Sequence, residues 1–235
     1  MAGLEVSAVT HGVVVAELDR PPGNLWTVNL CRELISLLTN PPDEAHLLRL
    51  RSRGEVFCLG REREGSTPGK LRDEAQVLVS VQRALRRTRL VTVAEVQGDA
   101  AGFGVGVLAA CDVAVATADA NFSFPEVGIE LAPALVLAWL PRIVGERQAF
   151  WLTATGEKVP AARALELGLL NAVVASPDEL RKDVDGRVAM LRAADPRVQA
   201  EIRDMLRAFA PLGDDQALDM SIDRLVVGSL RRGEA

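Results

Sequence analysis

Hydrophobic and polar positions alternate in the first part of the chain and then change period. Residues 4–9 and 13–18 are alternating or continuously apolar on either side of His11-Gly12. Such runs around a glycine predict two strands joined by a tight turn. Over residues 27–38 the apolar side chains recur at helical spacing instead, which predicts a helix. We therefore expect a hairpin followed by a helix.

Strands and helices continue to alternate up to about residue 116. A polar, Gly-containing loop is followed by helical spacing over residues 71–87. The β-branched run at residues 91–96 is bounded by Gly98, and the same signature returns after a Gly- and Ala-rich helix. Such runs are typical of buried strands. The predicted strands span residues 46–50, 55–58, 91–96 and 113–116.

Beyond Glu126 the pattern is helical almost throughout. Strands alternating with helices early, and helices alone late, predict a layered α/β core with an appended helical region. We place the core at residues 1–175 and the helical region of the same domain at residues 176–235. The predicted helices span residues 134–144, 147–154, 160–167, 177–192, 197–209 and 215–227.

Composition narrows the class of protein. A length of 235 residues fits one large domain. No window approaches the roughly eighteen uncharged apolar residues of a membrane span, so we expect a soluble protein. The first residues lack the basic segment and apolar run of a signal peptide, which predicts a cytoplasmic location. The net charge of −5 includes no long basic run, so nucleic acid is not an expected partner.

Several kinds of chemistry are not expected. The three cysteines are odd in number and widely spaced, which predicts free thiols rather than disulfides. No cluster of Cys, His, Asp or Glu has metal-ligand spacing, so we expect no metal. Both histidines precede the turns that carry the candidate site, and the chain has no Tyr. No catalytic histidine or tyrosine is therefore expected.

The most informative segment is the Gly-rich turn at residues 96–106, between a β-branched strand and an apolar helix. A helix that begins near Gly102 or Phe103 presents unpaired N–H groups and the positive end of its dipole, which suit an anion or a developing oxyanion. Tight packing is the alternative explanation for these glycines. A dinucleotide fingerprint is not supported, because Gly102, Gly104 and Gly106 lack its spacing.

Two further segments carry candidate chemistry. Residues 57–62 run from a strand into a Gly turn, where Arg61 supplies another N–H group. Glu126 follows Pro125 in an otherwise apolar neighbourhood. A carboxyl group held among apolar residues has its pKa raised towards the working range of a general acid–base catalyst. An ordinary solvated turn residue is the alternative interpretation of Glu126.

In their order and spacing, these segments resemble the crotonase (enoyl-CoA hydratase/isomerase) family over residues 4–174. Single motifs of this kind arise by chance, so the resemblance depends on several matches in order. The matching motifs are Asp19-Arg20-Pro21, Phe57-Cys58-Leu59-Gly60, the segment from Gln97-Gly98 to Cys111-Asp112, Phe124-Pro125-Glu126-Val127-Gly128, and Gly156 with Ala161, Ala164, Gly168 and Leu169.

The resemblance implies an α/β fold, the crotonase (ClpP-like) spiral of ββα units with a C-terminal helical trimerisation region. It implies a homotrimer or a hexamer built as a dimer of trimers. It also implies an acyl-CoA thioester as the bound molecule, with coenzyme A as part of the substrate and no separate cofactor. The backbone N–H groups of Arg61 and Phe103 would then bind the thioester oxygen and stabilise an enolate.

Gly106 is the clearest departure from the family's pattern. Hydratases of the family use two glutamates, and Gly106 stands at the first of these positions, which leaves Glu126. A single glutamate resembles the family's Δ3,Δ2-enoyl-CoA isomerases. In that interpretation Glu126 removes a proton from C2 and returns it at C4, while the two N–H groups hold the dienolate.

Two rival functions stay open. Hydration or another enolate reaction would need a substitute carboxylate, for which Asp99 and Glu130 are candidates. Ala134 is a further accessory position. A non-catalytic acyl-CoA-binding subunit would have kept the oxyanion turns after losing the carboxylate expected at Gly106, although the presence of Glu126 argues against this.

The remaining candidate residues would bind substrate. Leu59, Gly60 and Gly102 belong to the turns that carry the two N–H groups, so we expect them at the acyl thioester. The three tryptophans are most simply explained as core or subunit-contact residues, and Trp139 is the best candidate among them for contacting an acyl chain. Together with the expected oxyanion residues, they define a predicted site built from three separate segments.

Overall fold

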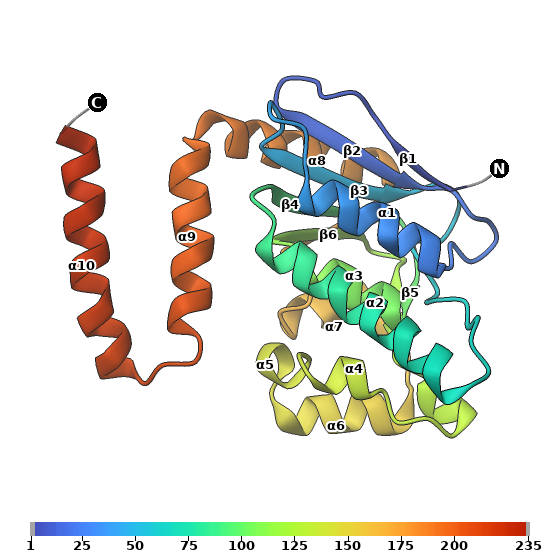
Figure 1. Cartoon of the computed structure of the whole chain (residues 1–235). Coiled ribbons are helices and arrows are strands. Elements are labelled where there is room, and N and C mark those ends of the chain that lie inside the picture. Colours follow the sequence, from blue (N-terminus) through green and yellow to red (C-terminus); the bar gives the residue numbers. More distant parts are fainter. Residues whose placement is uncertain (1–2, 234–235) are drawn as a thin grey trace. The chain divides into compact units, whose positions relative to one another are not determined.

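A six-stranded sheet forms the centre of the chain up to Ala193 (Figure 1). The computed structural model describes residues 3–233. The first two strands pair antiparallel as the predicted hairpin, and every other neighbouring pair is parallel. In spatial order the strands are β1 (Leu4–Val6), β2 (Val13–Leu18), β3 (Leu47–Ser52), β4 (Val91–Val96), β6 (Val113–Thr117) and β9 (Ala172–Val174).

Alternation along β2 shows how the two faces of this sheet differ. Val14, Ala16 and Leu18 are buried in the main hydrophobic core, whereas Val13 and Glu17 point to the opposite face. The core face is covered by α1 (Val28–Thr39), α2 (Pro68–Arg87) and α3 (Phe103–Ala110), and the opposite face is partly covered by α8 (Pro177–Ala193).

Strand β4 lies between these layers and is buried at all six positions. A parallel strand that is covered on both faces needs apolar residues at consecutive positions, which explains the unbroken β-branched run in the sequence. Val91 and Val93 pack with Leu180 and Val184 of α8, while Val96 packs in the main core.

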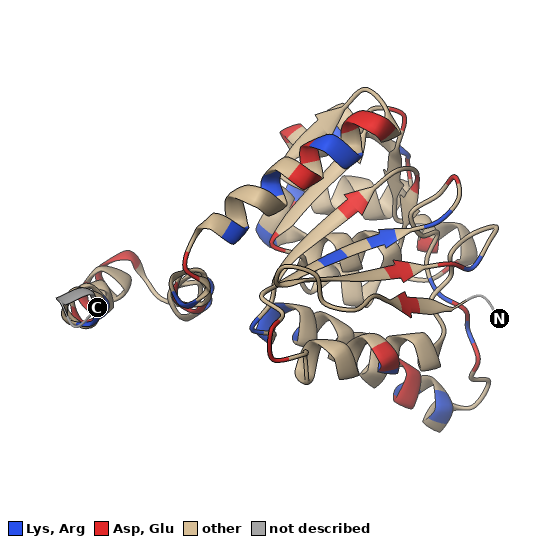
Figure 2. Cartoon of the chain, turned by 90° about the horizontal axis from the view of Figure 1, so that it is seen from above, with Lys and Arg blue, Asp and Glu red and all other residues tan. Residues whose placement is uncertain are grey.

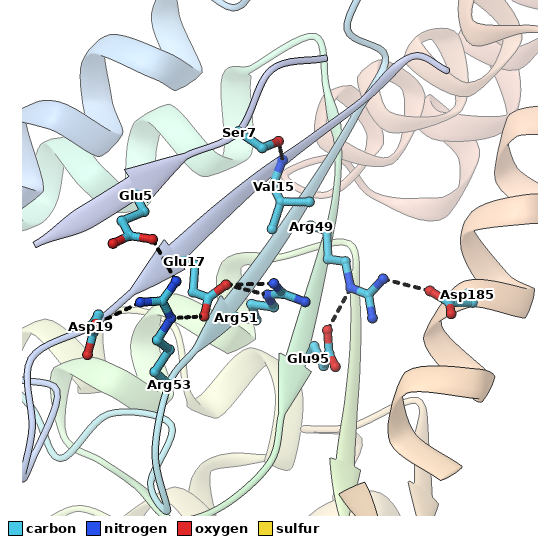
Figure 3. A network of polar contacts seen from close by, with 10 residues as sticks. All are labelled: Glu5, Ser7, Val15, Glu17, Asp19, Arg49, Arg51, Arg53, Glu95 and Asp185. Carbon is cyan, nitrogen blue, oxygen red and sulfur yellow. Dashed lines mark hydrogen bonds and ion pairs between the residues drawn. The ribbon is translucent and has the colours of Figure 1, made fainter. Parts of the chain in front are cut away.

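Arg49 on β3 connects the outer face of the sheet to α8 (Figure 3). Its Nε donates to Glu95 of β4 at 2.6 Å, and its Nη1 donates to Asp185 of α8 at 2.6 Å. The side chains of Arg49 and Glu95 are only 12% and 7% exposed. Burial of both partners is tolerable because each charge is neutralised by hydrogen-bonded contact.

A second ion-pair cluster surrounds Glu17 on β2 (Figure 3). Glu17 Oε2 accepts from Arg51 Nε and Nη2, and Glu17 Oε1 accepts from Arg53 Nε at 2.6 Å. Arg53 also pairs with Glu5 and Asp19. Figure 2 shows acidic and basic positions side by side on these strands, so neighbouring charges balance one another.

A second, three-stranded sheet was not predicted from the sequence. It consists of β5 (Ala100–Ala101), β7 (Asn121–Ser123) and β8 (Val159–Pro160). Strands of two or three residues are too short to show a periodic pattern, and their pairing depends on segments far apart in the chain. This small sheet places the Gly-rich turn beside the segment that leads to Glu126.

Other differences from the sequence predictions are local. The strand expected at residues 55–58 is reduced to one bridge between Cys58 and Ala100. The helix expected at residues 134–144 is divided in two, because Pro141 starts a new helix. The remaining short elements are the 3₁₀ helix η1 (Pro125–Ile129), α4 (Ala134–Leu137), α5 (Pro141–Val144), α6 (Glu146–Thr155) and α7 (Ala161–Glu166).

The chain from Ala194 onward forms a separate unit. It contains α9 (Pro196–Phe209) and α10 (Asp214–Gly233). The division at Ala193 places α8 in the first unit, whereas the sequence analysis drew its boundary at residue 175, before α8. None of the helices described in residues 3–233 combines the length and apolar character needed to span a bilayer. Both helices of the second unit expose large apolar side chains: Val198, Ile202, Leu206, Leu218, Ile222 and Leu225.

Candidate active site

The N–H group of Arg61 is oriented by a single parallel bridge to Trp26. Trp26 N–H donates to the carbonyl of Gly60 at 3.1 Å, and Glu62 N–H donates to the carbonyl of Trp26 at 2.9 Å. In a parallel ladder the residue between these two bonds turns its own N–H to the other side. Arg61 N–H therefore points away from Trp26. Gly60 makes this turn with a φ of 124°, a conformation that favours glycine.

The N–H group of Phe103 is available to a ligand for a different reason, which is its position at the start of a helix. Phe103 is the first residue of α3, so no preceding turn of helix supplies a carbonyl for its N–H. The helix dipole adds positive potential at the same end. Gly102 precedes it with a φ of 50° and a ψ of −115°, and its own N–H donates to Ser123 of β7 at 2.9 Å. The start of α3 is thus anchored to the small sheet.

Backbone hydrogen bonds bring the two turns side by side. Cys58 N–H donates to the carbonyl of Asp99 at 3.2 Å, and Ala101 N–H donates to the carbonyl of Cys58 at 2.8 Å. A Cβ atom at Gly104 would lie 2.3 Å from the Cys58 carbonyl oxygen, so only glycine allows this approach. The segments that carry Arg61 and Phe103 are therefore adjacent, as the predicted oxyanion site requires.

Glu126 lies directly against the Gly-rich turn. It belongs to η1, and a Cβ atom at Gly102 would lie 2.9 Å from its Oε1 atom. Its Oε2 atom is buried and has no hydrogen-bond partner among the described residues. Burial raises the pKa of the Glu126 carboxyl group above 4.5, although the nearby charge of Arg61 partly opposes the rise. These are the properties of a carboxylate suited to proton transfer.

The space beside Gly106 is filled by hydrogen-bond donors. Relative to a Cβ atom built on Gly106, Gln82 Nε2 lies at 2.6 Å and Trp139 Nε1 at 3.8 Å. Gln82 comes from α2, and the Trp139 ring packs edge-on against Phe124 with centroids 6.3 Å apart. The atoms nearest to this position therefore belong to an amide and an indole, where a two-glutamate enzyme has a carboxylate.

The side chain of Arg61 is held by α2. Its Nη1 donates to Glu74 Oε2 at 3.2 Å, and Glu74 Oε1 accepts from the N–H of Glu64 at 2.9 Å. Glu74 is only 6% exposed, so this pair fixes the loop after Gly60 on the helix. The guanidinium group is thus paired with Glu74 and not with Glu126. Its charge nevertheless acts to lower the pKa of Glu126.

The other predicted accessory residues do not join this cluster of contacts. Asp99 accepts hydrogen bonds from the backbone and side-chain nitrogens of Asn121 and pairs with Lys158, so its carboxylate is occupied at the small sheet. Glu130 is exposed with a φ of 58°, and Ala134 is exposed at the start of α4. Leu59 is 43% exposed beside the buried Gly60.

Gln82 was missed in the sequence analysis, although a signal was present. Leu78, Val81 and Leu85 form the buried stripe of α2, and Gln82 follows Leu78 by four residues on the same side. A lone amide on the inward stripe of an amphipathic helix is a candidate for a buried polar role.

The described residues contain no group of three or more His, Cys, Asp or Glu side chains arranged to hold a metal ion. The arrangement is instead two backbone N–H groups on adjacent turns, one carboxylate of raised pKa and a pair of side-chain donors. Such a site can stabilise an oxyanion and move a proton with groups of its own.

Fold and site together define an α/β enzyme of the crotonase type. A family model described as enoyl-CoA hydratase/isomerase matches residues 8–225. The chain belongs to this family, and it is an enzyme of the hydratase/isomerase type.

Individual relatives are distant and carry different names. A trans-2-decenoyl-[acyl-carrier-protein] isomerase of Streptococcus mutans is 26% identical over 92% of this chain and 87% of its own length. A probable enoyl-CoA hydratase of Rhodobacter capsulatus is 31% identical over 72% of this chain and 68% of its own. An enoyl-CoA hydratase structure from Mycobacterium smegmatis superposes with a TM-score of 0.90 at 24% identity, covering 96% of this chain and 90% of the other. The structure of a putative enoyl-CoA hydratase from Thermobifida fusca, in complex with CoA, superposes with a TM-score of 0.87 at 25% identity. The match covers 100% of this chain and 95% of the other.

Proposed function

We propose that the protein moves a double bond within an acyl thioester and that Glu126 is its single acid–base group. The observation that carries this proposal is the surroundings of Gly106, where Gln82 and Trp139 stand in place of a second carboxylate. Syn addition of water uses two carboxylates in this family. Transfer of one proton between two carbons requires only one.

In the proposed reaction the thioester oxygen binds the N–H groups of Arg61 and Phe103. Glu126 removes a proton from C2, and the negative charge moves onto the thioester oxygen as a dienolate. Preorganised N–H donors of this kind typically contribute on the order of 3 kcal/mol each to the transition state. Glu126 then returns the proton at C4, so the carboxylate is regenerated and no water is consumed.

Coenzyme A is the carrier that we propose for the acyl group, as part of the substrate rather than as a separate cofactor. The CoA complex among the similar structures supports this choice. The isomerase from Streptococcus mutans is named for an acyl-carrier-protein thioester, so carrier identity belongs in the test.

Assembly into trimers, alone or paired as hexamers, is also part of the proposal. Its support is the pair of apolar stripes that α9 and α10 expose at roughly four-residue intervals. Such stripes are typical of helices that pack against another chain. Light scattering of the full chain would measure the assembly directly.

The deciding experiment incubates the protein with 3-enoyl-CoA and 2-enoyl-CoA of several chain lengths in ¹⁸O-labelled water. We expect an isomer without mass gain, lost in Glu126→Gln. Glu146→Gln is the matched control, because Glu146 is an exposed glutamate at the start of α6. Incorporation of labelled oxygen would establish hydration instead. Binding without turnover in either protein would identify a binding subunit.

A further inference from the structure

A cavity of about 550 Å³ lies between the C-terminal ends of α1 and α2. The two helices pack side by side on the core face of the main sheet (Figure 1). The cavity is lined by residues of both helices and of the loops that follow them. Its volume is within the range of roughly 300–1,000 Å³ that is typical of small-molecule sites.

This cavity is separate from the candidate active site. It borders the loop just before β4 begins at Val91, whereas the Gly-rich turn follows the end of β4 at Val96. A strand of six residues is about 20 Å long. Helix α2 also divides the two places, because Gln82 reaches Gly106 of α3 while Arg83 lines the cavity beside α1. A ligand held here is therefore not the thioester group of the proposed substrate.

The lining of the cavity has a net positive charge. Arg83 and Arg87 of α2 and Arg89 of the following loop contribute to it, and no acidic residue does. A second cavity, of about 520 Å³ on the outer face of the sheet, is lined by as many glutamates as arginines. Charges in the second cavity neutralise one another, whereas those in the first have no counter-charge in the lining.

Arg89 is held in place by neutral acceptors. Its guanidinium group donates to the carbonyl oxygens of Ala45, Pro41 and Pro42. These bonds use three of the five N–H donors of an arginine and leave its positive charge without a carboxylate partner among residues 3–233. A cation fixed in this way is preorganised, because it needs no reordering when an anion binds.

Arg83 and Arg87 lie four residues apart on one side of α2. Like charges at this spacing repel each other, and neither side chain forms an ion pair with another described residue. Arg87 lies in the last turn of α2, where its charge offsets the helix dipole, but Arg83 lies before that turn. The dipole therefore does not account for the pair, whereas an anion between the two guanidinium groups would relieve their repulsion.

The apolar part of the lining indicates the body of the ligand. Ile35, Leu38, Pro41 and Ala84 supply aliphatic surface, and no aromatic ring lines the cavity. An aliphatic chain can bury its surface against such a wall. Guanidinium groups suit a carboxylate or phosphate headgroup, to which they donate two parallel hydrogen bonds. The two parts of the lining thus fit the two parts of an amphiphilic anion.

We propose that the cavity between α1 and α2 binds a small amphiphilic anion, with a carboxylate or phosphate headgroup at Arg83, Arg87 and Arg89 and an aliphatic chain along Ile35 and Leu38. This site is independent of the proposed function, since it uses none of the residues assigned to the thioester or to proton transfer. Loss of one therefore leaves the other intact.

The first test measures the affinities of octyl phosphate, octanoate, inorganic phosphate and octan-1-ol for the full chain by calorimetry. We expect octyl phosphate and octanoate to bind at least about tenfold more tightly than the other two, because only they combine a headgroup with a chain. Inorganic phosphate or octanol that binds as tightly as octyl phosphate would overturn the proposal. So would the absence of binding by all four.

Substitutions locate the headgroup. Arg83→Gln combined with Arg87→Gln should weaken binding of octyl phosphate at least about tenfold. Arg72→Gln combined with Arg86→Gln is the matched control, because it removes two exposed arginines from the same helix that do not line the cavity. Equal losses in the two double variants would show attraction by net charge alone and would overturn the site.

Hydrogen exchange of the unmodified chain provides a test that does not depend on how the variants fold. With octyl phosphate present, we expect slower amide exchange over residues 35–42 and 80–90 and unchanged exchange over residues 100–106. Protection confined to residues 100–106 would place the anion at the candidate active site and overturn the proposal. Isomerisation of 3-enoyl-CoA is measured separately, so its absence would overturn the proposed function alone.

Discussion

Two partly buried glutamates, one on the outer face of the main sheet and one at the candidate site, have opposite electrostatic surroundings. Glu17, on the outer face, accepts hydrogen bonds from Arg51 and Arg53. Burial alone would raise its pKa, but the two arginines outweigh burial and lower it below 4.5. Glu126, at the candidate site, has a buried oxygen without a partner, and its pKa is raised.

This contrast separates charged residues that stabilise the fold from the carboxylate that we propose to be the acid–base group. Paired charges on the outer face of the sheet hold strands and α8 together. At the site, unpaired polar atoms reduce stability and keep their hydrogen-bonding capacity for a substrate. The same residue type therefore has a structural role in one place and, in the proposed function, a chemical role in the other.

The largest expected effect is the loss of activity in Glu126→Gln. We expect isomerisation to fall by about 10²- to 10⁴-fold, because general acid–base catalysis is removed. Stability should respond in the opposite sense. A raised folded pKa gives stability at pH values below the unfolded pKa, and this stability is lost as the pH rises through the folded pKa.

Urea unfolding of the two proteins at neutral and acidic pH checks this second part. Glu126→Gln should be at least as stable as the unmodified chain at neutral pH, and its stability should vary less with pH above 4.5. A large destabilisation at neutral pH would show that Glu126 belongs to the paired, structural class after all.

Glu95→Gln on the outer face should, in contrast, lower the stability of the fold. Removing one partner leaves Arg49 buried without a full counter-charge, so we expect the free energy of unfolding to fall by about 3 kcal/mol. Asp185→Asn breaks the other bond to Arg49. Because the Asp185 side chain is 66% exposed, this change should lower the free energy of unfolding by less than about 1 kcal/mol. Equal losses in the two variants would contradict the distinction between buried and exposed pairs.

Gly106→Glu combined with Gln82→Ala would test whether a second carboxylate changes the reaction. Gln82 must be shortened, because a Cβ atom on Gly106 would lie 2.6 Å from its Nε2 atom. We expect ¹⁸O-labelled 3-hydroxyacyl-CoA to form from 2-enoyl-CoA at least about tenfold above the background of the unmodified protein, since two carboxylates can then orient the water that adds to the double bond. Gln82→Ala alone is the control, and label in that variant would show that the added glutamate is not the cause.

The smallest effect is expected for Arg61→Gln, which keeps the backbone N–H and removes the positive charge. That charge lowers the pKa of Glu126 against the larger effect of burial. Because the base must be ionised to act, the acidic limb of the pH–rate profile should move to higher pH. Arg63→Gln, at the exposed neighbouring arginine, should leave the limb in place. A shift to lower pH would contradict the assigned sign.

The sequence predicted the main architecture because its long elements carry strong periodic patterns. The hairpin, the helices at α1 and α2 and the buried strand β4 all appear close to their expected bounds. Strands β5, β7 and β8 could not be predicted, since elements of two or three residues are defined by pairing partners that are distant in the chain.

At the site, the sequence predicted the turns but not what surrounds them. The adjacency of the segments at Arg61 and Phe103 and the contact of Glu126 with Gly102 agree with the expected grouping. The occupied state of Asp99 and the approach of Gln82 to Gly106 depend on tertiary contacts that no local spacing encodes. Their roles in catalysis stay predictions until the variants are measured.

The N–H groups at residues 61 and 103 have a consequence for how such a protein can evolve. Every amino acid except proline carries this group, so the proposed oxyanion donors persist through almost any mutation at these two codons. Side chains there can drift and reshape the wall of the pocket while the donors stay in place. Over generations the substrate of such a protein can therefore change while the two N–H groups proposed to stabilise the oxyanion are retained.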